Sequence, residues 1–386
     1  MQQTISYNVL APGPVNIHPK VLQTLSLPSI HHRTPEFDKI LARTLTNLKI
    51  IFNTHEPVFI LTSTGSGGME SLLINTLNPG DKVLGIDSGK FGERWCEMAK
   101  VFGANLTTLK VEWGKSVHVG DVAAHLQKNP DTKIVFCQAC ETSTGAQHPI
   151  RELGELIHNY PDCLFLVDGI TALGAQPLPM DQWHIDGLVG GSQKAFMLPA
   201  GLSFVSFSQK AWKKINSNKQ ARYYFDIRHE LKANQKGETF FSSNVFLIRA
   251  LDTVLQIILE QGLDNHLLEI EKRALFTRKY AQVLGFSIYP ESPSSSITAL
   301  VTPMNMDSQK IRTILEEKHH ITIMGGQDQL KGKINRIGHM GYITWDQQYE
   351  LIEKLALTLK EINPQWQASM PMEQLRLQMK GYPSHA

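Results

Sequence analysis

Two ionisable residues stand at the ends of short apolar segments near the middle of this 386-residue chain. Asp168 ends the run LFLVD, and Lys194 follows the segment 185–189 after the turn GGSQ. Continuous apolar runs of this length are typical of strands buried in a parallel sheet. A carboxylate and an amine at the carboxyl ends of such strands are costly to bury unless something pairs with them. The pattern therefore predicts a bound group that satisfies both.

Pyridoxal phosphate is a cofactor that meets both demands. A lysine amine forms a Schiff base with its aldehyde, and an aspartate keeps its ring nitrogen protonated so that the ring can accept electrons. Each residue alone has an ordinary explanation, because an aspartate after a strand is commonly a helix cap and a lysine is commonly a surface charge. The cofactor hypothesis therefore depends on the order of two motifs, VDGITALGA around Asp168 and GGSQKAFMLPAGL around Lys194.

These two motifs resemble those of the class V aminotransferases, which are fold-type I pyridoxal-phosphate enzymes. The resemblance covers nearly the whole chain and is greatest to the serine–pyruvate and alanine–glyoxylate aminotransferase branch, which includes proteins labelled as a soluble hydrogenase small subunit. It implies an α/β fold: a large domain with a mostly parallel seven-stranded sheet, and a small C-terminal α/β domain. It also implies that Lys194 and Asp168 are catalytic and bind the cofactor together with Gln193.

A turn rich in glycines and hydroxyls, TSTGSGG, begins at Thr62 between a predicted strand and a predicted helix. Free backbone amides and the helix dipole make such a turn suited to a phosphate. It is neither a Rossmann fingerprint, because Glu70 stands at the third glycine position, nor a Walker loop, because no Gly-Lys-Ser/Thr follows. An ordinary compact connection is the alternative. The resemblance assigns the cofactor phosphate to three residues of the turn: Thr64, Gly65 and Ser66.

Four further residues receive cofactor roles from the resemblance. Phe91 occupies the ring-stacking position, where an aromatic contact adds roughly 1 kcal/mol beyond burial, although a core phenylalanine is the alternative. Thr142 corresponds to the residue that bonds near the ring oxygen, although ETSTG also suits a plain polar turn. Thr239 and Ser242 match a loop that reaches the neighbouring subunit's phosphate site, with Ser242 replacing a more usual threonine.

Two residues are expected to contact the substrate. Arg336 lies in the motif NRIGHMG, and its planar guanidinium suits a carboxylate in a way that lysine does not. The resemblance gives Arg336 the substrate's α-carboxylate, whereas a structural ion pair is the alternative. The proline-punctuated residues 9–20 cannot form a regular element and are expected to run extended across a surface. In the family the PGP segment lies over the active-site mouth, which makes Gly13 the second substrate-contact residue.

Composition limits the class of protein. A length of 386 residues exceeds one ordinary core, and 42% hydrophobic with 19% charged residues describes a soluble globular chain. The formal charge of +2 argues against a nucleic-acid partner. No apolar stretch reaches the length of a membrane span, and the N-terminus lacks a signal pattern. We therefore expect a cytoplasmic protein with no membrane partner.

The cysteines and histidines do not indicate a metal or disulfide site. Four cysteines in a chain of this length form no disulfide framework. Cys137 and Cys140 have CxxC spacing without a second pair, so buried thiols are the better interpretation. The histidine pairs at 31–32 and 319–320 also lack a spaced partner set. We predict no metal site.

The elements that position these residues follow a strand–helix alternation from 57 to 207. This alternation implies a mostly parallel sheet covered on both faces, with the site at the carboxyl ends of its strands. After Gly285 the pattern changes to short strands, a helix that Asp307 could cap, and a capping box at Thr344. The expected organisation has four parts: an extended segment 1–20, a large domain 21–262, a small domain 263–365, and a loosely docked tail 366–386.

The resemblance implies a transaminase that moves the amino group of alanine or serine to glyoxylate or pyruvate through a Lys194 Schiff base. Its kinetics should be ping-pong. It also implies a homodimer with active sites at the interface. A cysteine desulfurase is a poor alternative because no cysteine follows Cys163. A transaminase for aspartate or a phosphonate amine, and a non-enzymatic accessory subunit of a redox complex, remain open.

Overall fold

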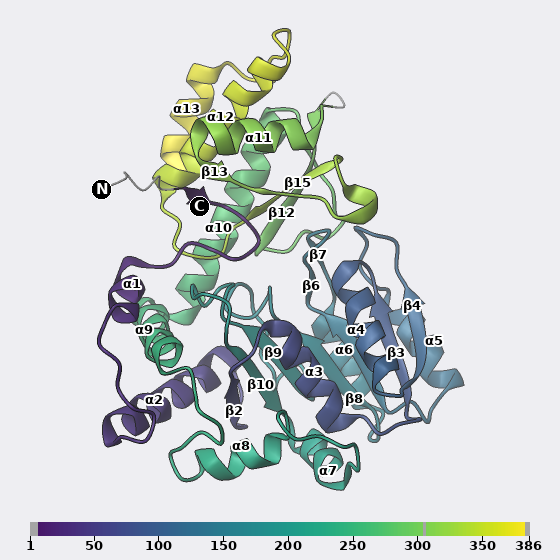
Figure 1. Cartoon of the computed structure of the whole chain (residues 1–386). Coiled ribbons are helices and arrows are strands. Elements are labelled where there is room, and N and C mark those ends of the chain that lie inside the picture. Colours follow the sequence, from purple (N-terminus) through teal and green to yellow (C-terminus); the bar gives the residue numbers. More distant parts are fainter. Residues whose placement is uncertain (1–6, 304–305, 383–386) are drawn as a thin grey trace.

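The computed structural model describes residues 7–303 and 306–382 (Figure 1). Its main sheet has seven strands in the order β2-β10-β9-β8-β5-β3-β4. β10 is antiparallel to both of its neighbours, and the other pairings of this sheet are parallel. The strands are β2 Val58–Leu61, β3 Lys82–Asp87, β4 Asn105–Lys110, β5 Ile134–Gln138, β8 Leu164–Asp168, β9 Gly187–Gly191 and β10 Ser203–Phe207. The expected mostly parallel seven-stranded sheet is confirmed.

Side chains of the central strands alternate between two hydrophobic cores. Val135 and Phe165 face one core, whereas Phe136 and Leu166 face the other. Because the side-chain period of a strand is two, a continuous apolar run supplies both faces at once. On the first face lie α2 Pro35–Phe52, α5 Val119–Lys128, α6 Ile150–His158 and α9 Val245–Gln261; on the second lie α3 Gly65–Thr76, α4 Lys90–Val101 and α7 Gln209–Ser217.

A second, smaller sheet has its own core (Figure 1). It is antiparallel and contains β11 Ser287–Ile288, β12 Ile297–Val301, β15 Ile334–Gly338 and β14 Met324–Gly325, in that order. The helices that contribute to its core are α10 Leu263–Val283, α11 Ser308–His319 and α12 Trp345–Ile362. Asp307 caps α11, and Thr344 forms a capping box with Gln347 at the start of α12, as predicted.

The N-terminal strap, which we define as residues 8–16, joins this small sheet to the main sheet. Its strand β1 Asn8–Val9 pairs in parallel with β13 Ile321–Thr322. The chain then turns toward α1 Pro19–Leu25, which packs on α9 (Figure 1). The extended course was predicted, but the surface position was wrong, because Leu10 is fully buried in the small core.

Two helices differ from the sequence expectations. The charged sequence from Arg222 to Glu238 has little periodicity and is expected to form a connection, but it contains α8 Ile227–Asn234, with Asp226 as its cap. The tail forms α13 Met372–Gly381 and buries Leu375 and Met379 in the small core, so the expected loose docking was wrong. Within the two described ranges, no helix has the length and apolar content needed to cross a bilayer.

Candidate active site

Asp168 and Lys194 lie at the carboxyl ends of the neighbouring strands β8 and β9. Asp168 is the last residue of β8, and one of its carboxylate oxygens accepts a hydrogen bond of 2.9 Å from the amide of Ile170. Lys194 follows β9 by three residues. Both side chains are buried, with exposed fractions of 6% and 9% for the two residues. The sheet therefore brings the two predicted catalytic groups to one edge.

Burial shifts both groups toward neutrality. It raises the pKa of Asp168 to about 7, and the Glu141 carboxylate adds to this shift. It lowers the pKa of Lys194 to about 8, with a further contribution from the Arg336 guanidinium. An amine with a lowered pKa in a desolvated pocket is suited to accept and return a proton near neutral pH.

Unsatisfied polar atoms at this edge fit a pyridoxal ring and its phosphate. In the described chain, no donor reaches the second carboxylate oxygen of Asp168, so a protonated ring nitrogen would supply the missing partner. The side-chain oxygen of Gln193 is likewise buried and unpartnered within these residues. It lies beside Gly191, where an added β-carbon would come within 3.2 Å of it. The residues present therefore fit the cofactor that the sequence predicts.

The strap covers Lys194. The Nζ atom of Lys194 donates a hydrogen bond of 2.7 Å to the carbonyl of Pro12. A β-carbon on Gly13 would lie 2.7 Å from the same Nζ, so the backbone passes the amine too closely for any other residue. The predicted contact residue Gly13 is thus placed over the predicted catalytic lysine.

Within the described ranges, the guanidinium of Arg336 forms its hydrogen bonds with backbone carbonyls. Its Nε donates to the carbonyl of Gly325 at 2.9 Å, and one terminal nitrogen donates to the carbonyl of Thr142 at 2.7 Å. Burial lowers the pKa of Arg336 to about 10, and no carboxylate of the described chain forms an ion pair with it. A buried guanidinium without a counter-ion is costly, which fits a role in binding a substrate carboxylate.

The predicted phosphate turn forms the start of helix α3. The sequence pattern predicts that this helix starts at Met69, but it begins four residues earlier, at Gly65. Thr64 is its N-cap and makes no side-chain capping bond. The amide of Gly68 donates to the carbonyl of Thr64, so the amides before it belong to the first turn and have no helical acceptor. A β-carbon on Gly65 would lie 2.6 Å from Ile170, next to Asp168. The first turn of α3 therefore lies close to Asp168.

Phe91 and Thr142 lie on segments joined by a buried carboxylate. Phe91 is half-buried in the first turn of α4, and its amide donates to Glu141 at 3.2 Å. Thr142 belongs to the hairpin of β6 Cys140–Glu141 and β7 Ala146–Gln147, and its hydroxyl bonds to that of Thr171 at 2.7 Å. The hairpin also holds Arg336 through the Thr142 carbonyl.

Sequence reasoning missed three groups at this site. Glu141 is fully buried and its carboxylate also accepts from the amide of Gly92 at 3.0 Å. Arg94 lies one helical turn after Phe91, and the Pro12 carbonyl holds Lys194. The spacing from Phe91 to Arg94 could have indicated a shared helix face. No sequence signal identifies which backbone carbonyl meets a lysine.

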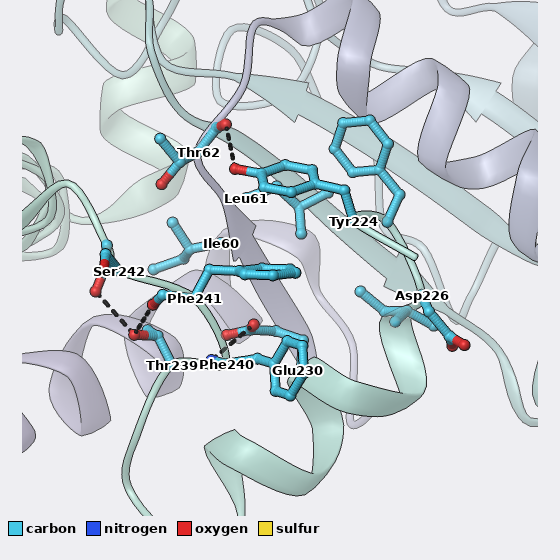
Figure 2. Close-up of a pocket in the computed structure, with 13 residues that line it drawn as sticks. Ile60, Leu61, Thr62, Tyr224, Asp226, Glu230, Thr239, Phe240, Phe241 and Ser242 are labelled. Atoms are coloured by element: carbon cyan, nitrogen blue, oxygen red, sulfur yellow. Dashed lines mark hydrogen bonds between the residues drawn. The ribbon is translucent and has the colours of Figure 1, made fainter. Parts of the chain in front are cut away.

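Thr239 and Ser242 are not brought to the other predicted residues. They line a small pocket of about 30 Å³ beside the end of β2, with Tyr224 and Phe241 stacked across it (Figure 2). The Thr239 hydroxyl bonds to the Phe241 carbonyl at 2.9 Å and to the Ser243 hydroxyl at 2.8 Å. Among described residues, neither hydroxyl contacts Lys194 or the α3 turn. A pocket of this volume holds little more than water.

All four cysteines are free and buried, as the sequence indicated. Burial raises the pKa of each thiol, for example that of Cys140 to about 11. Thiols held in the protonated form are poor nucleophiles. The chemistry of this site therefore falls to its amine, carboxylates and guanidinium groups.

Known proteins match the chain over nearly its whole length. The sequence pattern of the aminotransferase class-V family matches residues 21–342. A soluble hydrogenase 42 kDa subunit from Anabaena cylindrica is 35% identical over 92% of this chain and 93% of its own. An L-aspartate–glyoxylate aminotransferase from Paracoccus denitrificans is 33% identical over 87% of both chains. A serine–glyoxylate aminotransferase from Hyphomicrobium methylovorum is 32% identical over 88% of this chain and 86% of its own.

A solved structure agrees with these sequence matches. The crystal structure of an alanine–glyoxylate aminotransferase from Nostoc sp. superposes with a TM-score of 0.89. It is 28% identical in sequence and covers 92% of this chain and 96% of its own. The likeness extends to both sheets, because it spans nearly all of each chain.

Proposed function

The chain belongs to the class V aminotransferases, fold-type I enzymes that use pyridoxal 5'-phosphate, and from this premise we propose its specific reaction. It moves the amino group of alanine or serine to glyoxylate or pyruvate by a ping-pong mechanism. The observation that carries the proposal is that Lys194, Asp168 and Arg336 are all buried at this site. Among the described residues, neither cation forms an ion pair, and one carboxylate oxygen of Asp168 has no donor.

Each of the chain's own side chains at this site has a separate role in the proposed reaction. When bound, the cofactor supplies an aldehyde that accepts the amino group and a ring that takes up the electron pair of the broken C–H bond. Arg336 binds the α-carboxylate and so fixes the direction of the Cα–H bond. Lys194 Nζ, with its pKa lowered to about 8, takes the Cα proton and returns it. Asp168 holds the ring nitrogen's proton, and the strap keeps water from the amine.

The direct test follows the visible absorbance of the purified, cofactor-loaded protein after addition of alanine, serine or aspartate. Alanine or serine should convert the absorbance to that of the aminated cofactor, and glyoxylate should restore the original absorbance. Lys194→Ala should lose this conversion while keeping its assembly state. A loaded protein whose absorbance responds to no amino acid would contradict the proposed reaction.

Aspartate is the second candidate donor, because the Paracoccus relative is named for it. Aspartate carries a second carboxylate, so this reaction needs a second cation that faces the substrate. Comparison of kcat/KM for alanine, serine and aspartate with glyoxylate as acceptor separates the candidates. A preference for aspartate of tenfold or more would replace the small-donor proposal.

A non-enzymatic role as an accessory subunit is the remaining alternative, because the Anabaena relative is named as a hydrogenase subunit. In the described chain, the buried Lys194 and Arg336 donate to backbone carbonyls and form no ion pair. This favours catalysis, since a scaffold gains nothing from two costly buried charges. An accessory subunit would show no turnover with any of the three donors. Turnover that disappears in Lys194→Ala would exclude it.

We also propose a homodimer in which Thr239 and Ser242 serve the partner's phosphate site. Two observations support this assembly. Both hydroxyls line a pocket beside Thr62, and among the described residues neither forms a hydrogen bond with the first turn of α3. Tyr223, Tyr224 and Phe240 nearby expose 71%, 47% and 39% of their surface, an apolar area suited to an interface.

A further inference from the structure

Arg94 connects two segments that bear predicted cofactor residues. It lies on α4, one turn after Phe91, and its guanidinium carbon is 5.2 Å from the centre of the Phe91 ring. One of its terminal nitrogens donates to the hydroxyl of Ser66 at 3.4 Å, in the first turn of α3. The side chain thus spans from the ring-stacking position to the phosphate turn.

The charge of Arg94 is unpaired in the described part of the chain. No carboxylate there forms an ion pair with it, although Glu93 and Glu97 lie on the same helix. Glu93 instead pairs with Lys90 at 2.7 Å. Among the described residues, this exposed side chain has one hydrogen-bond partner, the neutral hydroxyl of Ser66. A guanidinium held beside free helix amides and without a counter-ion is arranged for an anion.

A phosphate monoester needs more charge than the helix provides. It carries about −1.5 to −2 near pH 7, whereas a helix N-terminus supplies roughly half a positive charge. The helix amides and the Ser66 hydroxyl can donate hydrogen bonds, but they carry no full charge. Arg94 is the cation that the structure holds against this turn.

We propose that Arg94 supplies the positive charge of the cofactor's phosphate site. This inference rests on the proposed function, because it assumes the cofactor. It leaves Arg336 as the cation proposed for the substrate's α-carboxylate.

A comparison of pyridoxal phosphate with pyridoxal separates the effect of the Arg94 charge from the effect of the contact with the cofactor ring. Equilibrium dissociation constants of pyridoxal phosphate and of pyridoxal, which lacks the phosphate, are measured by absorbance for the wild type, Arg94→Gln and Arg94→Lys. Arg94→Gln should bind pyridoxal phosphate about tenfold or more weakly and pyridoxal about equally. Arg94→Lys should recover part of the loss. Inorganic phosphate should compete with pyridoxal phosphate less well in Arg94→Gln than in the wild type.

Matched variants provide the controls. Arg151→Gln removes an exposed arginine that pairs with Glu155 on α6 and should bind both forms as the wild type does. Phe91→Leu should weaken the binding of pyridoxal phosphate and of pyridoxal by a similar factor. This variant removes the aromatic contact with the cofactor ring and keeps the positive charge of Arg94. Thermal unfolding of the cofactor-free variants identifies any protein that has failed to fold.

Three outcomes would overturn the proposal. Equal weakening of both forms in Arg94→Gln would assign Arg94 to the ring. Unchanged cofactor binding with a raised KM for aspartate would assign it to the substrate, while the aminotransferase function stands. A wild-type protein that binds neither form would overturn the proposed function together with this inference.

Discussion

In the proposed mechanism, the protonation of Lys194 decides when the site can act. Among the described residues its ammonium has one hydrogen-bond partner, the Pro12 carbonyl, and Arg336 repels it. Burial adds the larger cost and holds the pKa at about 8 rather than 10.5. The same shift that makes the amine a useful base also destabilises the folded, cofactor-free protein, since the unfolded state binds the proton more tightly.

Lys194→Met should therefore stabilise the cofactor-free protein below about pH 8. The penalty in the wild type is fully present below the folded pKa of about 8 and fades as pH rises toward 10.5. A difference of 2.5 pKa units corresponds to roughly 3 kcal/mol. Urea unfolding of both proteins at pH 6, 8 and 10 measures the free energies. A stability difference that does not shrink between pH 8 and 10 would show that protonation of Lys194 is not its cause.

Arg336→Lys should weaken binding of the amino acid and leave the cofactor in place. Lysine keeps the charge but loses the fork that matches a carboxylate, so KM should rise by about 10- to 100-fold. Steady-state kinetics with alanine measure KM, and an alkylamine without a carboxylate is the matched substrate. The preference for alanine over that amine should fall. An unchanged preference would remove Arg336 from the carboxylate site.

The residues found from sequence are those whose chemistry is in the side chain. Asp168 and Lys194 end apolar runs, and Arg336 lies in a distinctive motif. The Pro12 carbonyl could not be found in this way, because every residue has a carbonyl and only the fold decides which one meets an amine. Glu141 was passed over because its partners are backbone amides of a helix 50 residues away in sequence.

At the scale of elements, strand β15 links the two halves of the site. It carries Arg336, and two residues later the amide of Gly338 donates to the strap carbonyl of Leu10 at 2.8 Å. The strap continues to Pro12, whose carbonyl accepts the hydrogen bond from Lys194. The proposed carboxylate site and the cover of the Lys194 amine are therefore linked by one backbone contact.

Gly338→Ala should displace the strap from Lys194. A β-carbon there would lie 2.1 Å from the carbonyl oxygen of Ala11, so the strap must move. We expect a loss of about 1–3 kcal/mol in unfolding free energy and a lower kcat, because the Lys194 amine loses its cover. The control is Gly120→Ala, whose β-carbon meets nothing within 4 Å. If Gly338→Ala loses stability but keeps its kcat, the strap has no part in positioning the amine.

Helices and strands were predicted correctly where apolar residues recur regularly along the sequence. They were missed where apolar residues are sparse. The central strands of the main sheet were found because both of their faces are apolar. α13 buries only Leu375 and Met379, a weak signal that the neighbouring prolines obscured. Half of the residues of α8 are charged or histidine and its start is fixed by the Asp226 cap, so its pattern looked irregular.

At the scale of the molecule, the positions of Thr239 and Ser242 predict shared sites in a dimer. In a mixed dimer, one subunit carries Lys194→Ala and the other carries Thr239→Ala with Ser242→Ala. Such a dimer should regain one site of normal cofactor affinity, because one of its two sites combines the intact Lys194 of one subunit with the intact Thr239 and Ser242 of the other. Each parent dimer should lack such a site. The measurement is cofactor binding to purified mixed dimers at low cofactor concentration. Mixed dimers that bind no better than the parents would place both hydroxyls with their own chain.

The overall architecture was predictable from the sequence because strand–helix alternation leaves few ways to cover a parallel sheet. The assembly around the site was less predictable. Contacts such as that between Gly338 and Leu10 join segments far apart in sequence, and neither segment has a pattern that specifies the other.

The strap also sets the order in which the site can be completed. Asn8 and Val9 leave the ribosome before nearly all of the described chain, yet their partners Ile321 and Thr322 are made near its end. Until then the main sheet that positions Lys194 can form, but the strap that covers this lysine is not in place. The nascent protein can thus build the main sheet early while its reactive amine stays accessible to water, and the site closes only after synthesis has reached the small sheet.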